Sequence, residues 1–207
     1  MTHRILAACL SLMLLAAAPA AAAASEPCTC ATAKQTDGWC EAHGIGYVAM
    51  VPIHSKLLYE TMDAHGHVLD LDTFTCERCR KAIETDGFCE QHRIGFVGKQ
   101  AYFSRLTYEL ARGRRLDLAT ISCRVCRKNA ADHGWCEKCG IGLVGDRAMV
   151  DLQSYDQAAK AIAILRAADE TARRCELCAM AMVTDTKCPR CKITYKEGKP
   201  LPPSSPQ

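Results

Sequence analysis

The sequence carries little excess charge and lacks the motifs that are typical of many enzymes and nucleic-acid-binding proteins. Its 26 Lys and Arg residues stand against 23 Asp and Glu residues, and the formal net charge of +3 is too small to indicate a polyanionic partner. Neither a phosphate-binding glycine loop nor a serine–histidine motif is visible, and no pair of carboxylates recurs along the chain. We therefore expect no nucleic-acid binding and no enzymatic activity.

Long apolar runs are also lacking, except for one near the first residue. The uncharged stretch Ile5–Ala18 follows Arg4, and small residues lead from it to Ala24. This order predicts a secretory signal peptide over residues 1–24. A membrane anchor is the alternative interpretation of the same stretch. With cleavage near Ala24, we expect a periplasmic or secreted protein that makes no membrane contact.

Cysteine is abundant, and the 15 cysteines recur in a pattern. Four units begin near Cys28, Cys76, Cys123 and Cys175, at intervals of 47 to 52 residues. The second unit reads "CERCRKAIETDGFCEQHRIGFVG" and the third reads "CRVCRKNAADHGWCEKCGIGLVG", so the fourth place holds a histidine in one and a cysteine in the other. A fixed period of this length indicates a repeated structural module.

Two ligand pairs at a fixed separation predict a tetrahedral zinc site, because zinc accepts either sulfur or imidazole nitrogen at each position. Nine residues separate the second cysteine from the third in every unit. In the first unit a single residue separates Cys28 from Cys30, and we expect the weakest site there. The pattern predicts about four zinc ions per chain. The predicted ligands are Cys28, Cys30, Cys40, His43, Cys76, Cys79, Cys89, His92, Cys123, Cys126, Cys136, Cys139, Cys175, Cys178, Cys188 and Cys191.

Two other uses of the cysteines compete with metal binding. An exported protein meets oxidants, which favours disulfides, and 14 cysteines remain once Cys9 leaves with the signal peptide. The first two units hold three cysteines each, however, and a histidine cannot replace half of a disulfide. Redox catalysis through an isolated Cys-x-x-Cys pair is the other alternative. Every pair here has a second pair at a fixed distance, and no βαβ pattern surrounds any of them.

Turn and strand signals lie inside each unit. Asp37-Gly38, Asp86-Gly87 and His133-Gly134 occupy the same place in the nine-residue spacer and predict a hairpin turn between short strands. The segments "IGYV", "IGFV" and "IGLV" follow the last ligand and predict a strand whose glycine permits a close approach. The other histidines, His54, His65, His67 and His133, are expected to be surface or turn residues.

Three helical segments separate the units. A shared Ser-(Lys/Arg)-Leu-x-Tyr-Glu pattern begins at Ser55 and Ser104, and the third segment has one apolar helical face. The segments "LDLDTFT" and "LDLATIS" predict short strands that enter the next unit. We therefore expect an α+β fold of four zinc-ribbon-like β-hairpin modules, joined by helices. The modules are expected at 25–52, 68–101, 114–147 and 174–197, the helices at 53–67, 102–113 and 148–173, and a disordered tail at 198–207.

The segment "CEKCGIGLVG", which begins at Cys136, resembles the heavy-metal-binding domain of periplasmic efflux-pump adaptors, and it is also similar to generic zinc ribbons. The resemblance implies a small β-hairpin metal module in an extracytoplasmic protein. The chain departs from that module in several ways. The histidine lies in the second ligand pair, Ile141 stands where a methionine follows Cys-Gly, the prolines of the first pair are missing, and the connecting helices have no counterpart.

These observations favour an exported, non-enzymatic, zinc-binding repeat protein that acts as an interaction scaffold for a protein partner. One alternative is a periplasmic heavy-metal buffer or chaperone that delivers zinc, copper or cadmium. The other is a disulfide-stabilised secreted repeat protein.

Overall fold

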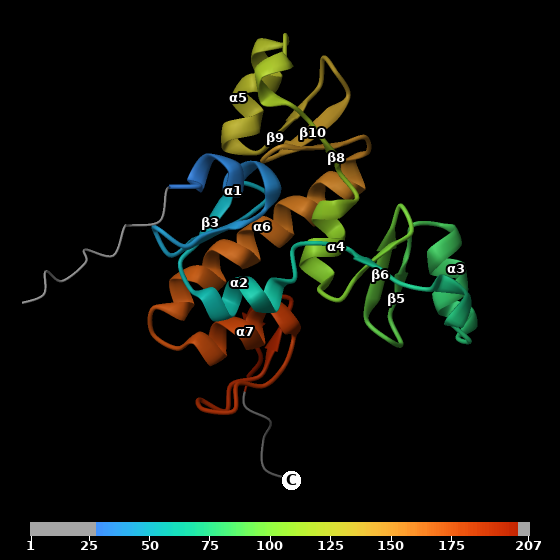
Figure 1. Cartoon of the computed structure of the whole chain (residues 1–207), viewed down its shortest axis with the longest axis vertical. Coiled ribbons are helices and arrows are strands. Elements are labelled where there is room, and N and C mark those ends of the chain that lie inside the picture. The colour runs from blue at the N-terminus through green and yellow to red at the C-terminus, as the bar shows by residue number, and fades with distance from the viewer. Residues whose placement is uncertain (1–27, 203–207) are drawn as a thin grey trace, which may run out of the picture.

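The computed structural model describes residues 28–202. The predicted signal peptide at residues 1–24 and the end of the predicted tail, residues 203–207, lie outside this range. The described chain is a mixed α+β structure in which small antiparallel sheets and short helices surround one long helix (Figure 1). We refer to residues 28–53, 67–102, 114–149 and 175–200 as units 1 to 4. No helix within 28–202 is both long enough and apolar enough to cross a membrane.

Each of the first three units contains a short α-helix followed by three strands. Unit 1 contains α1 (Cys30–Thr36), β1 (Trp39–Cys40), β2 (Ile45–Val48) and β3 (Val51–Ile53). Unit 2 contains α3 (Glu77–Glu84), β5 (Phe88–Cys89), β6 (Ile94–Val97) and β7 (Gln100–Tyr102). Unit 3 contains α5 (Arg124–Asp132), β9 (Gly134–Cys136), β10 (Ile141–Val144) and β11 (Arg147–Met149). Unit 4 contains α7 (Glu176–Thr184), β12 (Tyr195–Lys196) and β13 (Lys199–Pro200).

A helix fills most of the nine-residue spacer, so the hairpin turn predicted there is wrong. In unit 2, Cys79 and Ala82 are the buried residues of α3, and this spacing of three places them on one helical face. Asp86 follows the helix with a φ of 49°. The Asp-Gly signal was misread because a helix stop and a hairpin turn both use a left-handed residue. The hairpin lies after this helix, between β5 and β6.

The strand that follows each of the first two connecting helices joins the sheet of the next unit. β4 (His67–Val68) pairs with β7, and β8 (Arg114–Arg115) pairs with β11, so the sheet orders are β4-β7-β6-β5 and β8-β11-β10-β9. The strands predicted at "LDLDTFT" and "LDLATIS" are instead short 3₁₀ helices, η1 (Leu71–Thr73) and η2 (Leu118–Thr120). Asp70 and Asp117 cap them through side-chain hydrogen bonds, a local contact that competes with strand formation.

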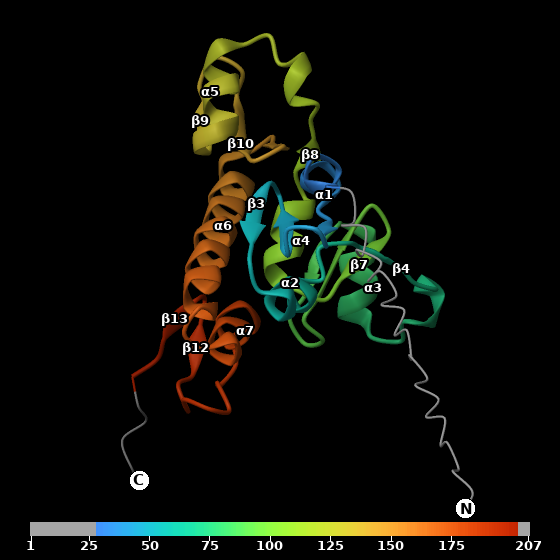
Figure 2. The same cartoon turned by 60° about the vertical axis from the view of Figure 1, so that its left-hand side comes forward.

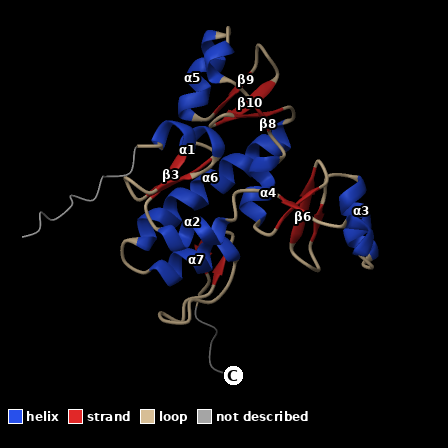
Figure 3. Cartoon of the chain, in the orientation of Figure 1, coloured by secondary structure: helices blue, strands red, loops and turns tan. Residues whose placement is uncertain are grey.

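The connecting helices lie within the ranges predicted for them (Figure 3). They are α2 (Lys56–Met62), α4 (Arg105–Ala111) and α6 (Leu152–Ala172). The tail predicted from residue 198 begins too early, because Lys199–Pro200 form a strand. The β13 strand pairs with β12 through a turn in which Glu197 and Gly198 have positive φ.

The long helix α6 is the centre of the main core. It contacts α2, α4 and α7, together with strands of units 1 and 3 (Figure 2). Leu58 of α2, Leu110 of α4 and Leu165 of α6 belong to this one apolar cluster, as do Val144 and Met149 of unit 3. Units 2 and 3 also keep small cores of their own. The units are therefore packed on a shared helical framework.

One aromatic contact couples each of the first three units to the helix that follows it. In each of these units, an aromatic residue in the strand that contains the third ligand lies against a tyrosine of the connecting helix that follows the unit. The ring centroids are 5.3 Å apart for Trp39 and Tyr59, 5.3 Å for Phe88 and Tyr108, and 5.9 Å for Trp135 and Tyr155. These aromatic residues therefore cover the connecting helix in addition to their own unit.

Two buried carboxylates join units that are distant in the sequence. Asp37, which is 3% exposed, accepts hydrogen bonds from Arg115 and Arg147 of unit 3. Asp169 of α6, which is 6% exposed, accepts from the His54 backbone N–H at 2.7 Å and lies 2.8 Å from His54 Nδ1. His54 is exposed, as expected of a surface residue, and it also links the end of unit 1 to α6.

Candidate metal centres

The structure brings the 16 predicted ligands together in four groups, one in each unit. The potential ligand atoms within every group lie within 4.8 Å of one another. The groups are Cys28, Cys30, Cys40 and His43; Cys76, Cys79, Cys89 and His92; Cys123, Cys126, Cys136 and Cys139; and Cys175, Cys178, Cys188 and Cys191. Each of these groups could hold a metal ion.

The N-terminus of the helix positions the first two side chains of a group, and the hairpin that follows positions the other two. In units 2 to 4 the first cysteine is the N-cap of the helix and the second lies in its first turn, as Cys76 and Cys79 do in α3. The third closes the strand before the hairpin in units 2 and 3 and follows the isolated β-bridge at Lys187 in unit 4, and the fourth lies in the turn that comes next. The residue after the fourth has a left-handed backbone in every unit, with φ of 56° at Arg93 and 63° at Gly140. This conformation turns the chain back into the next strand.

Unit 1 reaches the same grouping from a different local geometry. Its helix α1 begins at Cys30 itself and has Thr29 as its N-cap, so Cys28 lies before the helix. Cys28 is also exposed. The one-residue displacement therefore does not separate the group, and the prediction that this site is the weakest stays open to experiment.

The interatomic distances match the edges of a tetrahedron. Four ligands around zinc, with Zn–S near 2.3 Å and Zn–N near 2.0 Å, place two sulfurs about 3.8 Å apart and sulfur and nitrogen about 3.5 Å apart. The Sγ atoms of Cys175 and Cys191 are 3.8 Å apart, and those of Cys123 and Cys136 are 4.0 Å apart. Such separations are far longer than the disulfide bond of about 2.05 Å.

The two groups that contain histidine have the same dimensions. His92 Nδ1 lies 3.3 Å from Cys79 Sγ and 3.7 Å from Cys89 Sγ. In unit 1, the corresponding distances from His43 Nδ1 are 3.2 Å and 3.5 Å. In both units Nδ1 faces the sulfurs, so Nδ1 is the nitrogen that would bind a metal.

Burial differs systematically between the four places. The second and third residues are buried in units 2 to 4, and Cys136 and Cys188 are 0% exposed. The fourth residue is exposed in all four units, as His43, His92, Cys139 and Cys191. Each candidate centre therefore has one side in the core of its unit and one side at the surface.

In the first ligand pair of units 2 and 3, the surroundings favour ionisation of the first thiol and oppose ionisation of the second. Backbone N–H groups at the helix N-terminus lower the pKa of Cys76, and they lower the pKa of Cys123 to about 6. Burial raises the pKa of Cys79 to about 12 and raises the pKa of Cys126 as well. A metal ion that binds these units must therefore displace at least one proton.

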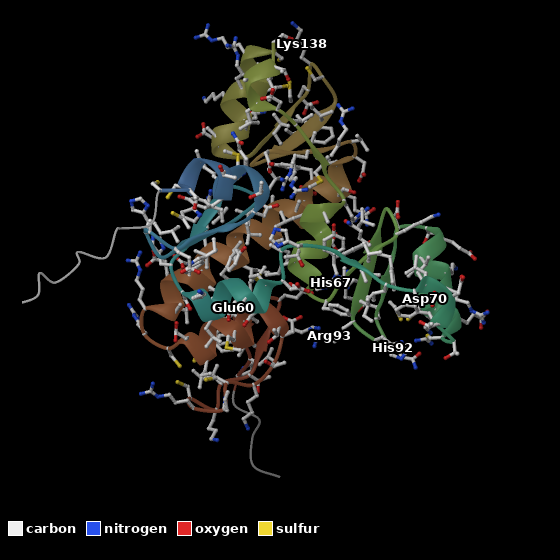
Figure 4. The ribbon with its side chains drawn as sticks, viewed as in Figure 1. Glu60, His67, Asp70, His92, Arg93 and Lys138 are labelled. Atoms are coloured by element: carbon white, nitrogen blue, oxygen red, sulfur yellow. The ribbon has the colours of Figure 1, made fainter. Side chains whose placement is uncertain are left out.

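The hairpin beside the candidate centre of unit 2 also contacts unit 4. Arg93, which follows His92, donates a hydrogen bond to the Thr184 carbonyl at the end of α7 (2.7 Å). Figure 4 shows His92 and Arg93 side by side at the lower end of unit 2. The hairpin that carries the fourth residue of unit 2 is thus attached to unit 4.

One side-chain contact that recurs in all four units was not predicted from the sequence. Asp37, Asp86, His133 and Asp185 each follow the unit's helix, and each accepts a hydrogen bond from a backbone N–H twelve residues later, at Ala49, Gly98, Gly145 and Glu197. The contact ties the end of the helix to the tip of the last hairpin. The available signal was the recurrence of Asp before the first ligand of the hairpin, which was interpreted only as a turn.

Four closed groups of thiols and imidazoles on a repeated scaffold are suited to soft or borderline metal ions, of which zinc fits the tetrahedral arrangement. Within 28–202, the structure forms no disulfide among the 14 cysteines. Comparison of the chain with protein-family models, with curated proteins and with solved structures finds no match.

Proposed function

We propose that the protein is an exported, non-enzymatic repeat protein in which about four zinc ions stabilise the units and the assembled units form a scaffold for a partner protein. The separate core of unit 2 carries this proposal. Its buried residues are Cys79, Ala82, Cys89, Phe96 and Ala101. Two of the five belong to the candidate metal centre, so little apolar area remains to stabilise the unit. A metal ion would supply much of the missing folding free energy.

The donor set supports a structural metal and opposes a catalytic one. A zinc ion with four protein ligands has no open position for water or substrate. The second and third ligands are buried in units 2 to 4, so loss of the metal there would also leave buried thiols without their partner. We infer that the metal and the fold are lost together.

The exposed fourth ligand favours a second candidate function. Cys139, Cys191, His43 and His92 are all at the surface. A heavy-metal buffer or chaperone for zinc, copper or cadmium would use such accessible ligands to pass its ion to another protein by ligand exchange. In that case the metal is cargo, and it would leave while the rest of the fold persists.

Native mass spectrometry of the protein isolated from the export compartment tests the proposal. We expect about four zinc ions per chain, with the first unit losing its ion most readily. The mass also shows whether the chain begins after Ala24. A sample without metal, and without free thiols after denaturation, would instead establish the disulfide-stabilised alternative.

Chelator kinetics separate the two metal-bound candidates. If zinc is structural, its transfer to a chelator follows the rate of unfolding that circular dichroism measures. If zinc is cargo, transfer is faster than unfolding, and the helical signal is retained.

A further inference from the structure

A groove with an apolar floor separates unit 1 from unit 3, and cations surround its smaller part, whereas Asp117 and Asp146 are among the lining residues of its larger part. One cavity of about 350 Å³ is lined by the apolar side chains of Met50, Leu118 and Ile121. A second cavity of about 690 Å³ shares Lys34, Met50 and Leu118 with the first, so the two form one continuous groove between α1 and α5. We call this the α1–α5 groove. The floor is closed where Gly145 approaches the Ala49 carbonyl, since a Cβ at that glycine would come within 2.2 Å of the oxygen.

Positive charge surrounds the smaller cavity and no carboxylate lines it. Its charged and titratable lining residues are Lys34, Arg127, His133 and Arg166. Within residues 28–202, none of the three cations forms an ion pair. The cations come from three different elements, α1, α5 and α6, so the positive rim is not the charged face of a single helix.

Two hydrogen-bond donors face each other at this rim. His133 Nδ1 accepts a hydrogen bond from the Gly145 N–H at 3.0 Å. Burial and the charge of Arg166 lower the pKa of His133, so the ring is neutral and carries its proton on Nε2. Nε2 lies 2.7 Å from a guanidinium nitrogen of Arg166, which can only donate. An acceptor placed beside this pair would satisfy both donors.

The repeat shows that this donor pair is peculiar to unit 3. The other three units have aspartate at the place of His133, and its carboxylate accepts the same backbone hydrogen bond. Aspartate at this place would leave a second oxygen available to Arg166. Unit 3 has histidine there instead, so this position supplies no negative charge to the exposed Arg166, which stays available to an anionic ligand.

We propose that the α1–α5 groove binds an acidic segment of a partner protein in which carboxylates alternate with aliphatic side chains. The aliphatic side chains pack on Met50, Leu118 and Ile121, and the carboxylates accept hydrogen bonds from Arg166, His133 and the other cations of the rim. The phosphate backbone of a nucleic acid would leave the apolar floor uncovered, and a membrane surface is too flat to enter a groove. This inference rests on the proposed scaffold function and names its partner chemistry.

Fluorescence anisotropy with a short, labelled peptide of alternating Glu and Leu tests the proposal on the full metal-loaded chain. The control peptide alternates Gln and Leu. We expect the acidic peptide to bind, the neutral one to bind at least about tenfold more weakly, and added salt to weaken the acidic complex. Equal binding of the two peptides, or stronger binding to anionic lipid vesicles, would overturn the proposal.

Three variants locate the binding site. The double variant Arg127→Glu and Arg166→Glu should weaken the acidic complex by about tenfold or more. Lys128→Glu changes the same charge on α5 outside the groove and should leave affinity within about twofold. His133→Asp should keep the Gly145 hydrogen bond, pair with Arg166 and weaken the complex, because aspartate already performs this role in the other units. Wild-type affinity in both groove variants would overturn the proposal.

The zinc content and circular dichroism of each sample distinguish failure of this inference from failure of the proposed function. A chain that binds about four zinc ions but no acidic peptide contradicts only the groove proposal. A folded chain that binds the acidic peptide through Arg127 and Arg166, but contains no metal, contradicts the zinc-scaffold function and leaves the groove in place.

Discussion

The ring of Tyr108 lies so close to Gly95 that a Cβ at the glycine would approach the tyrosine Cδ2 to 2.2 Å. Gly46 and Gly142 have the same relationship to Tyr59 and Tyr155, at 2.4 Å and 2.3 Å. In each case the glycine belongs to the strand after the candidate metal centre, and the tyrosine belongs to the helix that follows. This packing couples the metal-binding hairpins of units 1 to 3 to the helices that follow them.

Gly95→Ala is expected to destabilise unit 2 by about 1–3 kcal/mol, because the new methyl group forces the Tyr108 ring away from the strand. Urea denaturation followed by circular dichroism measures the change. The control is a double-mutant cycle with Tyr108→Ala. Once the ring is absent, adding Gly95→Ala should cost much less. Equal costs in both backgrounds would show that the contact is not responsible.

His92→Cys is expected to retain a metal ion in unit 2, whereas His92→Ala should lose it or bind it more weakly. Cys139 already occupies the equivalent place in unit 3, and a thiolate preserves the tetrahedron while it adds one negative charge. Zinc counting by native mass spectrometry checks both variants. The prediction fails if the alanine variant holds its ion as tightly as the wild-type chain.

Acidification is expected to release the metal. The pKa of the metal-free Cys79 thiol is about 12, so this thiol is protonated at neutral pH and must lose its proton when metal binds. Protons therefore favour the metal-free form, and the apparent affinity should fall by about tenfold per pH unit for each proton displaced. Competition with a chromophoric chelator between neutral and mildly acidic pH measures the slope. An affinity that does not change with pH would contradict thiol ligation.

Loss of the metal from unit 3 is expected to loosen α6. Val144 and Met149 of this unit belong to the main core cluster together with Leu165 of α6. The variant Cys136→Ser and Cys139→Ser should therefore raise hydrogen exchange across Leu152–Ala172 as well as within unit 3.

The matched control for this prediction is Cys89→Ser with His92→Ser in unit 2, the same two places of the ligand group. The core of unit 2 is separate from the main cluster, so exchange in α6 should change less. If exchange in the unit 3 variant rises only between residues 114 and 149, the units are independent and the coupled architecture is wrong.

Much of the candidate site was predictable because metal-ligand spacing is a local property. The pairs, the nine-residue spacer and the exchange of His92 for Cys139 are all visible along the chain, and they place four donor groups within reach of one ion whatever the rest of the protein does. The connecting helices were predictable for a similar reason, since their caps and apolar spacing lie within a few turns. Metal binding itself stays a prediction until it is measured.

Some local sequence patterns are compatible with two different secondary structures, and the sequence alone did not select between them. Asp86 has a left-handed backbone that suits either a hairpin or the end of a helix, and burial of Cys79 and Ala82 against the unit's sheet selects the helix. Likewise, "LDLDTFT" alternates like a strand, but the Asp70 cap makes it a 3₁₀ turn, and the edge of the sheet is taken by His67–Val68.

The sequence by itself determined the repeat, the ligand groups and the connecting helices, because each depends on residues close together along the chain. Only the tertiary structure decided which units touch. The contacts of Asp37 with Arg147 and of His133 with Arg166 join residues more than thirty positions apart, and no sequence period encodes such pairs. The α1–α5 groove exists for the same reason, since it forms where the packing of α6 brings unit 1 beside unit 3.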